Sequence, residues 1–239
     1  MLRKTKLLGI VSLLLANPCF SGFYVGVGVG PEGAHFMQRS HVTRLGAISN
    51  TAGEGAFNVY DTEHFSGTGE FGTLFGGYSL RYRNFYLGAE ANANISSVKY
   101  TLVNDELIHS NFLKTTFSIP NSEGIGILPG YFFSDSFWAY GRVGYANGQV
   151  KIRESDPTVR SSTSNRNGIR YGAGVRYNLL DPHWTLMMDY SQINYTKIKS
   201  HVFEPNGGVT KIAHIYPNTA QVAFGLIFNF DTPKQAFVK

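Results

Sequence analysis

The sequence predicts an all-β protein, an eight-stranded antiparallel up-and-down transmembrane β-barrel with short periplasmic turns and four long extracellular loops. Three observations predict it: an N-terminal export signal, an apolar–polar alternation of period two after that signal, and connections that alternate between short and long. The composition agrees, because only 15% of the residues are charged and 14% are aromatic, with 27 glycines. Such a chain suits a surface that faces lipid around a tightly filled lumen.

Residues 1–21 have the pattern of a secretory signal peptide that is removed on export. The charged region holds Arg3, Lys4 and Lys6, and residues 7–16 form the apolar region. Ten residues span about 15 Å as a helix, which is short of a hydrocarbon core of about 30 Å. We therefore expect export across the inner membrane of a Gram-negative cell.

The only cysteine, Cys19, falls inside this segment. A lipoprotein signal ending at Cys19 and a retained N-terminal helix are the alternatives, and Pro18 argues against the first. Removal of 1–21 leaves 18 basic and 16 acidic residues, so the formal charge of +5 belongs largely to the signal. We therefore expect no nucleic-acid partner. The predicted organisation is a barrel over 22–230 and a short periplasmic tail over 231–239.

Eight segments after the signal alternate with the period of a half-buried strand. In 169–179, for example, Tyr171 and Val175 share one parity while Arg170 and Arg176 share the other. Strands of about 9–11 residues cross a bilayer when tilted. The predicted strands are about 22–36, 69–80, 85–95, 116–133, 137–151, 169–179, 184–198 and 219–230. Pro120 and Pro129 predict an irregularity in the fourth of them.

The connections between these segments support a barrel. Tight turns are expected at 81–84, 134–136 and 180–183, and long polar loops at 37–68, 99–115, 152–167 and 199–217. An even number of strands with both termini at the short-turn side is typical of outer-membrane barrels. Aromatic residues at the short-turn ends of the strands predict an interfacial belt. They are Tyr82, Phe85, Tyr86, Phe132, Phe133, Phe137, Trp138, Tyr177, Trp184, Phe228 and Phe230.

A soluble, lipocalin-like ligand-binding barrel is the alternative fold. It would turn its apolar residues inward, and in this sequence glycine, asparagine and charge share the face opposite to the apolar one. If the apolar face meets lipid, five charged residues point into the lumen, and all of them except Arg170 are expected at similar heights above the short turns. They are Glu90, Arg142, Arg170, Arg176 and Asp189. We hypothesise an arginine–carboxylate network that plugs the lumen, with solvated charges in lumen water as the alternative.

Several short stretches resemble the opacity-protein and OmpA-type family of eight-stranded outer-membrane barrels. They are Gly22-Phe23-Tyr24-Val25-Gly26, Phe75-Gly76-Gly77-Tyr78, Tyr140-Gly141-Arg142-Val143-Gly144-Tyr145, Gly172-Ala173-Gly174-Val175-Arg176-Tyr177 and the closing stretch from Val222 to Phe230. The resemblance spans 22–230 and implies insertion by the outer-membrane assembly machinery, with surface loops that contact host components. Members commonly end on the last strand's phenylalanine, whereas Asp231 to Lys239 follow Phe230 in this chain.

We looked for catalytic residues because some small outer-membrane barrels modify lipid A. His64 and Ser66, with Glu63 or Glu70 nearby, offer a base, a nucleophile and a carboxylate. We expect them to be ordinary polar loop residues, and therefore no enzyme. No histidine pair has zinc-ligand spacing on a definable element, and the Gly-x-Gly runs precede no helix, so we expect no metal and no cofactor.

The predicted function is that of a surface protein of the cell outer membrane, with a structural or adhesion role through its extracellular loops. The alternatives are a small porin-like channel, a lipid A-modifying enzyme and a soluble ligand binder. Expected partners are outer-membrane lipid and lipopolysaccharide, the assembly machinery, and a host or surface ligand, with the protein itself a monomer. Lys151, Arg160 and Arg166 near the third long loop either touch lipopolysaccharide phosphates or form a solvated rim.

Overall fold

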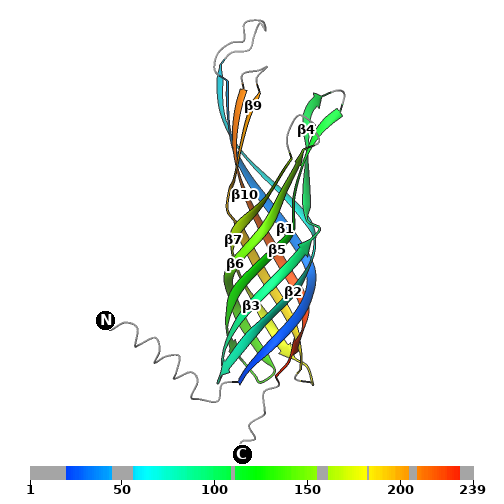
Figure 1. The fold of residues 1–239 in the computed structure, drawn as a ribbon, viewed down its shortest axis with the longest axis vertical. Helices are drawn as coiled ribbons and strands as arrows, with labels where there is room; N and C mark the ends of the chain where they lie inside the picture. The colour runs from blue at the N-terminus through cyan, green and yellow to red at the C-terminus, as the bar shows by residue number, and fades with distance from the viewer. Residues whose placement is uncertain are drawn as a thin grey trace, which may run out of the picture.

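A computed structural model of the chain describes residues 20–44, 56–108, 111–154, 161–181, 183–204 and 209–231. This part of the chain is all-β and forms a tall barrel from which strands project at one end (Figure 1). The strands are β1 (Phe20–Arg44), β2 (Phe57–Tyr82), β3 (Phe85–Ser96), β4 (Lys99–Ile108), β5 (Asn111–Phe132), β6 (Phe137–Glu154), β7 (Ser162–Asn178), β8 (Trp184–Tyr195), β9 (Ile198–Glu204) and β10 (Val209–Asn229). In the described residues, no helix is long and apolar enough to cross a bilayer.

Eight of the strands close a ring. The order is β1-β2-β3-β5-β6-β7-β8-β10, and β10 returns to pair with β1, all antiparallel. Closure satisfies the backbone hydrogen bonds without an exposed edge, which is the condition for crossing a bilayer with strands. The predicted eight-stranded antiparallel barrel is confirmed.

Alternate residues of each strand face opposite environments. On β1, Tyr24 is 3% exposed, whereas its neighbour Phe23 is 62% exposed and Val29 is 67% exposed. The outward apolar rows continue around the ring, for example through Ile125 and Ile169, which are both exposed. A continuous apolar outer wall is stable in lipid and would aggregate in water. The structure therefore excludes the lipocalin-like alternative.

The four segments predicted as long loops are largely strand, which corrects the sequence-based boundaries. β1 continues to Arg44 and β2 already begins at Phe57, so both run far into 37–68. β4 lies wholly inside a predicted loop, and all of β9 except Ile198 lies inside another; β4 pairs with β5, and β9 pairs with β10. Above the bilayer no lipid selects an apolar outer face, so the alternation fades while backbone pairing continues.

Two other local predictions have different outcomes. The irregularity expected near Pro120 is present as a register shift between Ser118 and Asn121. The aromatic belt is only partly outward, because Tyr86, Phe132 and Trp138 pack inside the lumen at its short-turn end. Phe85, Tyr177 and Phe230 do face outward. Proximity to a turn does not determine the direction of a side chain, because strand parity decides whether it faces lipid or the lumen.

The ends of the chain are described only in part. Of the predicted signal segment 1–21, only Phe20 and Ser21 are described, and their backbones open β1 opposite Arg81 and Leu80. Residues 1–19 and 232–239, and therefore most of the predicted signal and tail, lie outside the described residues. The signal and tail assignments remain predictions.

Replacing Leu74 with arginine tests the lipid-facing wall. Leu74 is 57% exposed on the outer face of β2, within the apolar band, between Val27 and Ala93. We expect Leu74→Arg to lower the free energy of unfolding in lipid vesicles by about 2–4 kcal/mol. Thr68→Arg, on the same face of β2 but six residues nearer the projecting end, should cost less than about 1 kcal/mol. Equal costs at the two positions would contradict this placement of the bilayer.

Candidate functional site

The lumen holds an ion-pair network just above its short-turn end. Arg142 bridges two carboxylates, with Nη2 at 2.8 Å from Oε1 of Glu90 and 3.1 Å from Oδ2 of Asp189. Arg176 donates from Nη2 to the other oxygen of Glu90 at 2.8 Å. Four of the five predicted lumen residues therefore meet in one cluster. All four are buried, with Arg176 at 2% exposure.

Tyrosines from three further positions add hydrogen bonds to this cluster. Tyr24 donates to Glu90 at 3.0 Å, Tyr140 donates to Asp189 at 2.7 Å, and Arg176 donates to the hydroxyl of Tyr86 at 2.9 Å. The guanidinium carbon of Arg176 also lies 4.8 Å from the ring centroid of Tyr24 and 4.9 Å from that of Tyr140. Buried charges need this degree of pairing, because a carboxylate stripped of its partners would be strongly destabilising.

Arg170 does not join these ion pairs and instead belongs to a second polar layer. It donates from Nε and Nη2 to the hydroxyl of Ser191 at 3.1 and 2.9 Å. Ser191 contacts Gln221 at 3.5 Å, and Gln221 donates to Oε1 of Glu32 at 2.8 Å. Glu32 is 3% exposed and was missed by the sequence analysis. Glu32 has the same parity on β1 as the inward Tyr24, and this alternation in the sequence predicts that Glu32 faces the lumen.

The charges of the lumen balance. In the described part of the barrel below the projections, the buried arginines Arg142, Arg170 and Arg176 face an equal number of buried carboxylates, those of Glu32, Glu90 and Asp189. Arg44 is also buried, but it lies higher, at the end of β1 in the first projection. Neutrality lowers the cost of keeping these groups out of bulk water. The arrangement favours a network that fills the lumen over isolated solvated charges.

An apolar layer lies beyond the polar layers, toward the projecting strands. Phe36 and Ile193 are both 0% exposed, and Val150 is 1% exposed. They belong to a cluster with Ala34, Phe65, Val98, Phe117, Ile119, Ala146, Tyr195, Ile198 and Ile215. Its rings are in contact: the centroids of Phe65 and Phe117 are 4.8 Å apart. We call this cluster the upper plug, and it closes the lumen above the ion pairs.

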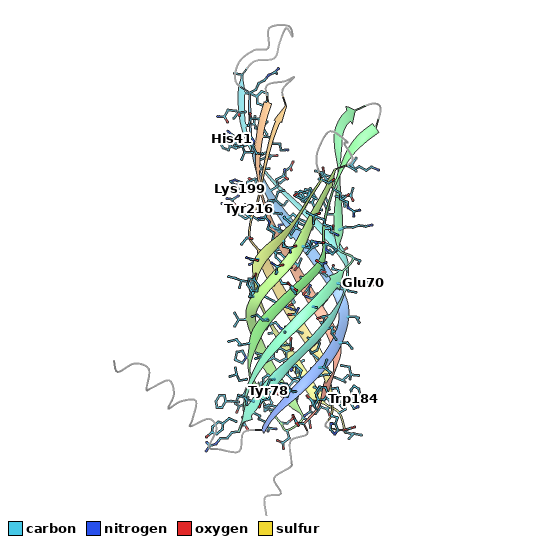
Figure 2. All side chains as sticks on the ribbon, viewed as in Figure 1. His41, Glu70, Tyr78, Trp184, Lys199 and Tyr216 are labelled. Carbon is cyan, nitrogen blue, oxygen red and sulfur yellow. The ribbon has the colours of Figure 1, made fainter. Side chains whose placement is uncertain are left out.

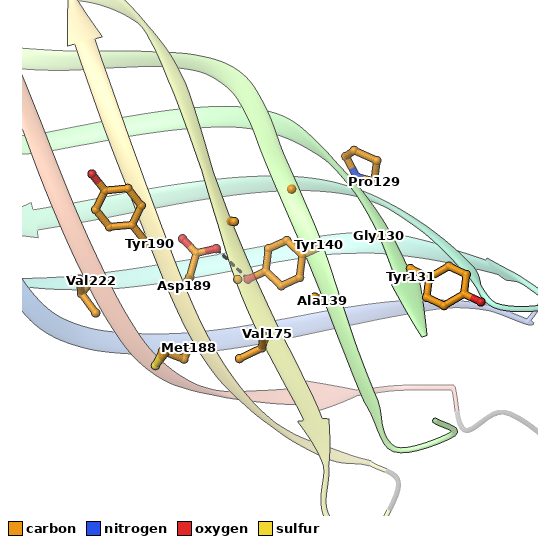
Figure 3. A pocket seen from close by; sticks show the side chains of 13 residues that line it. Pro129, Gly130, Tyr131, Ala139, Tyr140, Val175, Met188, Asp189, Tyr190 and Val222 are labelled. Carbon is orange, nitrogen blue, oxygen red and sulfur yellow. Dashed lines mark hydrogen bonds between the residues drawn. The ribbon is translucent and has the colours of Figure 1, made fainter. Parts of the chain in front are cut away.

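Glycines on the lumen face make room for the tyrosines. A Cβ at Gly77 would lie 2.6 Å from the hydroxyl of Tyr24, and one at Gly174 would lie 2.5 Å from the hydroxyl of Tyr140. Figure 3 shows Tyr140 bonded to Asp189 in the barrel wall. The outer side of this wall is a shallow, mostly apolar depression, whose lining includes Ala139, Val175, Met188, Tyr190 and Val222. It faces lipid.

Beyond the upper plug the strands divide into two projections (Figure 1). The first projection is the paired ends of β2, β1, β10 and β9, within 57–64, 37–44, 209–216 and 198–204. The second is β4 with the ends of β5, β6 and β7, within 99–108, 111–118, 150–154 and 162–164. In the described pairings, β2 does not join β4, and β9 does not join β7.

The catalytic arrangement considered from the sequence is not assembled. Ser66 contacts Nδ1 of His35 at 3.0 Å, and His64 contacts the other ring nitrogen of His35 at 3.3 Å. Glu63 lies on the opposite face, where its carboxylate accepts a hydrogen bond from Gln38 at 3.3 Å. Glu70 is four residues from Ser66 along β2, about 13 Å away. No group of three or more His, Cys, Asp or Glu in the described residues is placed to hold a metal ion.

The basic rim near the third long connection is only partly described. Arg166 donates to the hydroxyl of Ser164 at 3.2 Å and to the carbonyl of Lys197 at 3.4 Å. The second bond ties the upper end of β7 to the segment between β8 and β9. Arg160 lies outside the described residues, and Lys151 is half-buried at the start of the second projection.

Replacing Arg176 with methionine tests whether the network stabilises the barrel. The variant leaves Glu90 with one arginine and removes the cation from between the rings of Tyr24 and Tyr140. We expect Arg176→Met to lower the free energy of unfolding by about 3–5 kcal/mol. Arg81→Met, which breaks the ion pair with the exposed Asp135 at the short-turn end, should cost at most about 1 kcal/mol. Similar unfolding curves for both variants and the parent would instead indicate solvated lumen charges.

Comparisons with known proteins give one family match. A model of the outer membrane protein beta-barrel domain matches residues 15–228 of the chain. No curated protein matches the sequence.

Among solved structures, the chain is similar to several barrels at low identity. The outer membrane protease OmpT from Escherichia coli is 13% identical, with 87% of this chain and 97% of that one covered at a TM-score of 0.45. Neisserial surface protein A is also 13% identical, with 90% and 100% covered at 0.43. The attachment invasion locus protein Ail of Yersinia pestis is 14% identical, with 87% and 100% covered at 0.39.

Proposed function

The chain belongs to the outer membrane protein beta-barrel domain family and is an outer-membrane protein, and from this premise we propose that it is a surface-binding protein. In this proposal the barrel is an anchor that neither conducts nor catalyses. Binding of an extracellular partner falls to the two projections beyond the bilayer.

The observation that carries the proposal is the continuation of paired strands beyond a filled barrel (Figure 1). β1 and β2 stay paired from Phe20 opposite Arg81 to Arg44 opposite Phe57, which is far more than a bilayer crossing of about 9–11 residues requires. Strand pairing holds side chains in fixed positions, so less conformational entropy is lost when a partner binds. Long rigid extensions add nothing to anchoring in lipid, and a binding role explains them.

The remaining partners follow from the location. The apolar wall contacts outer-membrane lipid, the polar surface just above it contacts lipopolysaccharide, and insertion requires the assembly machinery of that membrane. We propose a monomer, because the ring closes on itself and needs no second copy to cover an edge.

The binding role is tested by shortening both projections at paired positions. In the first projection, 40–61 and 201–212 are each replaced by an Asn-Gly turn, which joins Arg39 to Thr62 and Ser200 to Ala213. In the second, 102–115 and 152–162 are replaced in the same way. Bacteria displaying the shortened protein should lose the adherence to host cells or extracellular matrix that the full-length protein confers. The faster migration of the unboiled protein on a gel confirms that the barrel is intact, and undiminished adherence with an intact barrel would refute the proposal.

Because the lumen is closed, we expect the barrel to conduct no ions in planar bilayers. The full-length protein should show no stable single-channel conductance, because the upper plug and the ion pairs both block the passage. Phe36→Gly with Ile193→Gly empties part of the upper plug but leaves the ion pairs, and should still conduct no stable current. Stable openings of the unaltered protein would favour the porin-like alternative.

A further inference from the structure

Five of the seven histidines of the chain lie on one face of the sheet that forms the first projection, four within the projection and His35 just below it. This face is the continuation of the outer wall of the barrel, above the apolar band, and Figure 2 places His41, Lys199 and Tyr216 along it. The histidines are His35, His41, His64, His201 and His214, and with Arg39 and Lys199 they form what we call the histidine face. Four strands contribute to it, so the clustering arises from tertiary structure.

The strand register places these residues in adjacent rows. One row runs from Arg39 on β1 to His214 on β10 and on to Lys199 on β9. The next row joins His41 to His201 through Ile212, which faces both. Directly opposed residues of antiparallel strands project to the same side of the sheet. The histidine face therefore covers about 20 Å along the strands and about 14 Å across them.

Short contacts hold the rings in place. His35 and His64 share a hydrogen bond of 3.3 Å between ring nitrogens, and His35 also contacts Ser66 at 3.0 Å. His41 contacts the side-chain oxygen of Asn58 at 2.7 Å and stacks on Tyr60 with ring centroids 4.1 Å apart. These partners are uncharged, so none of them neutralises a protonated imidazole.

The described acidic side chains of the first projection are turned away from this face, and Glu70, which is outward on β2, lies four residues below Ser66. The described residues of the histidine face include no carboxylate, and its charged members besides histidine are the exposed Arg39 and Lys199. Asp61 and Glu63 alternate with the outward residues of β2 and point to the opposite side, as the bond from Gln38 to Glu63 shows. Arg39 packs over Tyr216, with its guanidinium carbon 5.8 Å from the ring centroid. The tyrosines Tyr60 and Tyr216 complete the titratable groups of the histidine face.

Protonation changes the charge of this surface steeply. Imidazole is the side chain whose charge ordinarily changes near neutral pH. Arg39 and Lys199 give the histidine face two positive charges, and protonation of all five rings adds five more. Protonation also gives both ring nitrogens of His35 and His64 a hydrogen, so their shared bond is lost and two cations face each other. An anion placed between them would relieve this repulsion.

We propose that the histidine face binds a linear sulfated polysaccharide, and that binding strengthens as the pH falls below neutral. The inference deepens the proposed binding function and rests on it. Regularly spaced anions along an extended polymer match a surface of about 20 by 14 Å over which cationic side chains are distributed once the histidines are protonated. Sulfate esters stay ionised across this pH range, whereas a phosphate monoester takes up a proton near pH 6, just as the histidines do. The partner that gains most from histidine protonation is therefore the sulfated one.

The experiment measures binding of dextran sulfate to the full-length processed protein in lipid discs that lack lipopolysaccharide. At constant ionic strength, the affinity at about pH 5.5 should exceed that at about pH 7.5 by at least about tenfold, because imidazole protonation adds up to five positive charges to the histidine face. Uncharged dextran should bind at neither pH. A chelator is present throughout, so that bound metal does not contribute.

Three variants separate the histidine face from the rest of the protein. His41→Gln with His201→Gln and His214→Gln should abolish most of the pH-dependent gain while the heat-dependent gel shift is retained. Arg39→Gln should weaken binding at both pH values and leave their ratio unchanged. The matched control is Lys211→Gln, which removes a cation from the opposite face of β10 and should leave both affinities within about twofold of the parent.

Several outcomes would overturn the inference. They are an affinity for dextran sulfate that does not depend on pH, a triple histidine variant that behaves as the parent, equal affinity for single-stranded DNA of the same charge, and loss of binding when lipopolysaccharide is added to the discs. The last would mean that the cell's own lipid covers the histidine face. None of these outcomes bears on adherence through the projections, which the shortened variants test separately.

Discussion

The ion pairs of Glu90 with Arg142 and Arg176 are the interaction on which the rest of the structure depends. They join β3, β6 and β7 across the lumen, so strands that are far apart around the ring are tied through its centre. An eight-stranded barrel has room for side chains only, and whichever groups point inward must satisfy one another. Here tyrosine hydroxyls add hydrogen bonds to the ion pairs, and glycines on neighbouring strands provide the space for the tyrosine rings.

The filled lumen and the projections are structurally connected, because the same strands form both. The ion pairs and the upper plug fill the lumen and make the barrel rigid. A rigid barrel fixes the direction in which β1, β2 and β10 leave the bilayer. Because the strands continue without a break, their alternation continues as well. The face that meets lipid in the barrel becomes the face that carries histidine, arginine and lysine above it. The change from Val29 to His35 along β1 marks the passage from hydrocarbon to water.

Strand pairing above the bilayer also explains why residues that are close in sequence do not form a catalytic site there. Glu63 is adjacent to His64 in sequence, yet the two side chains are on opposite sides of the sheet. His35 is 29 residues from His64 in sequence and is its contact in space. Neighbours across strands, and not neighbours along the chain, determine what this surface can bind.

The sequence alone determined the barrel, because period-two alternation and turn spacing are local properties that the bilayer enforces on every strand. It also determined that Glu90, Arg142, Arg170, Arg176 and Asp189 point inward, since parity needs no tertiary information. Only the tertiary structure decided which of them pair, since this depends on the stagger of strands around the ring. Arg170 bonds to Ser191 and is linked to Glu32 in place of an ion pair. Tertiary structure alone also revealed β4, β9 and the histidine face, because water on both sides of the projections removes the periodic signal while backbone pairing persists.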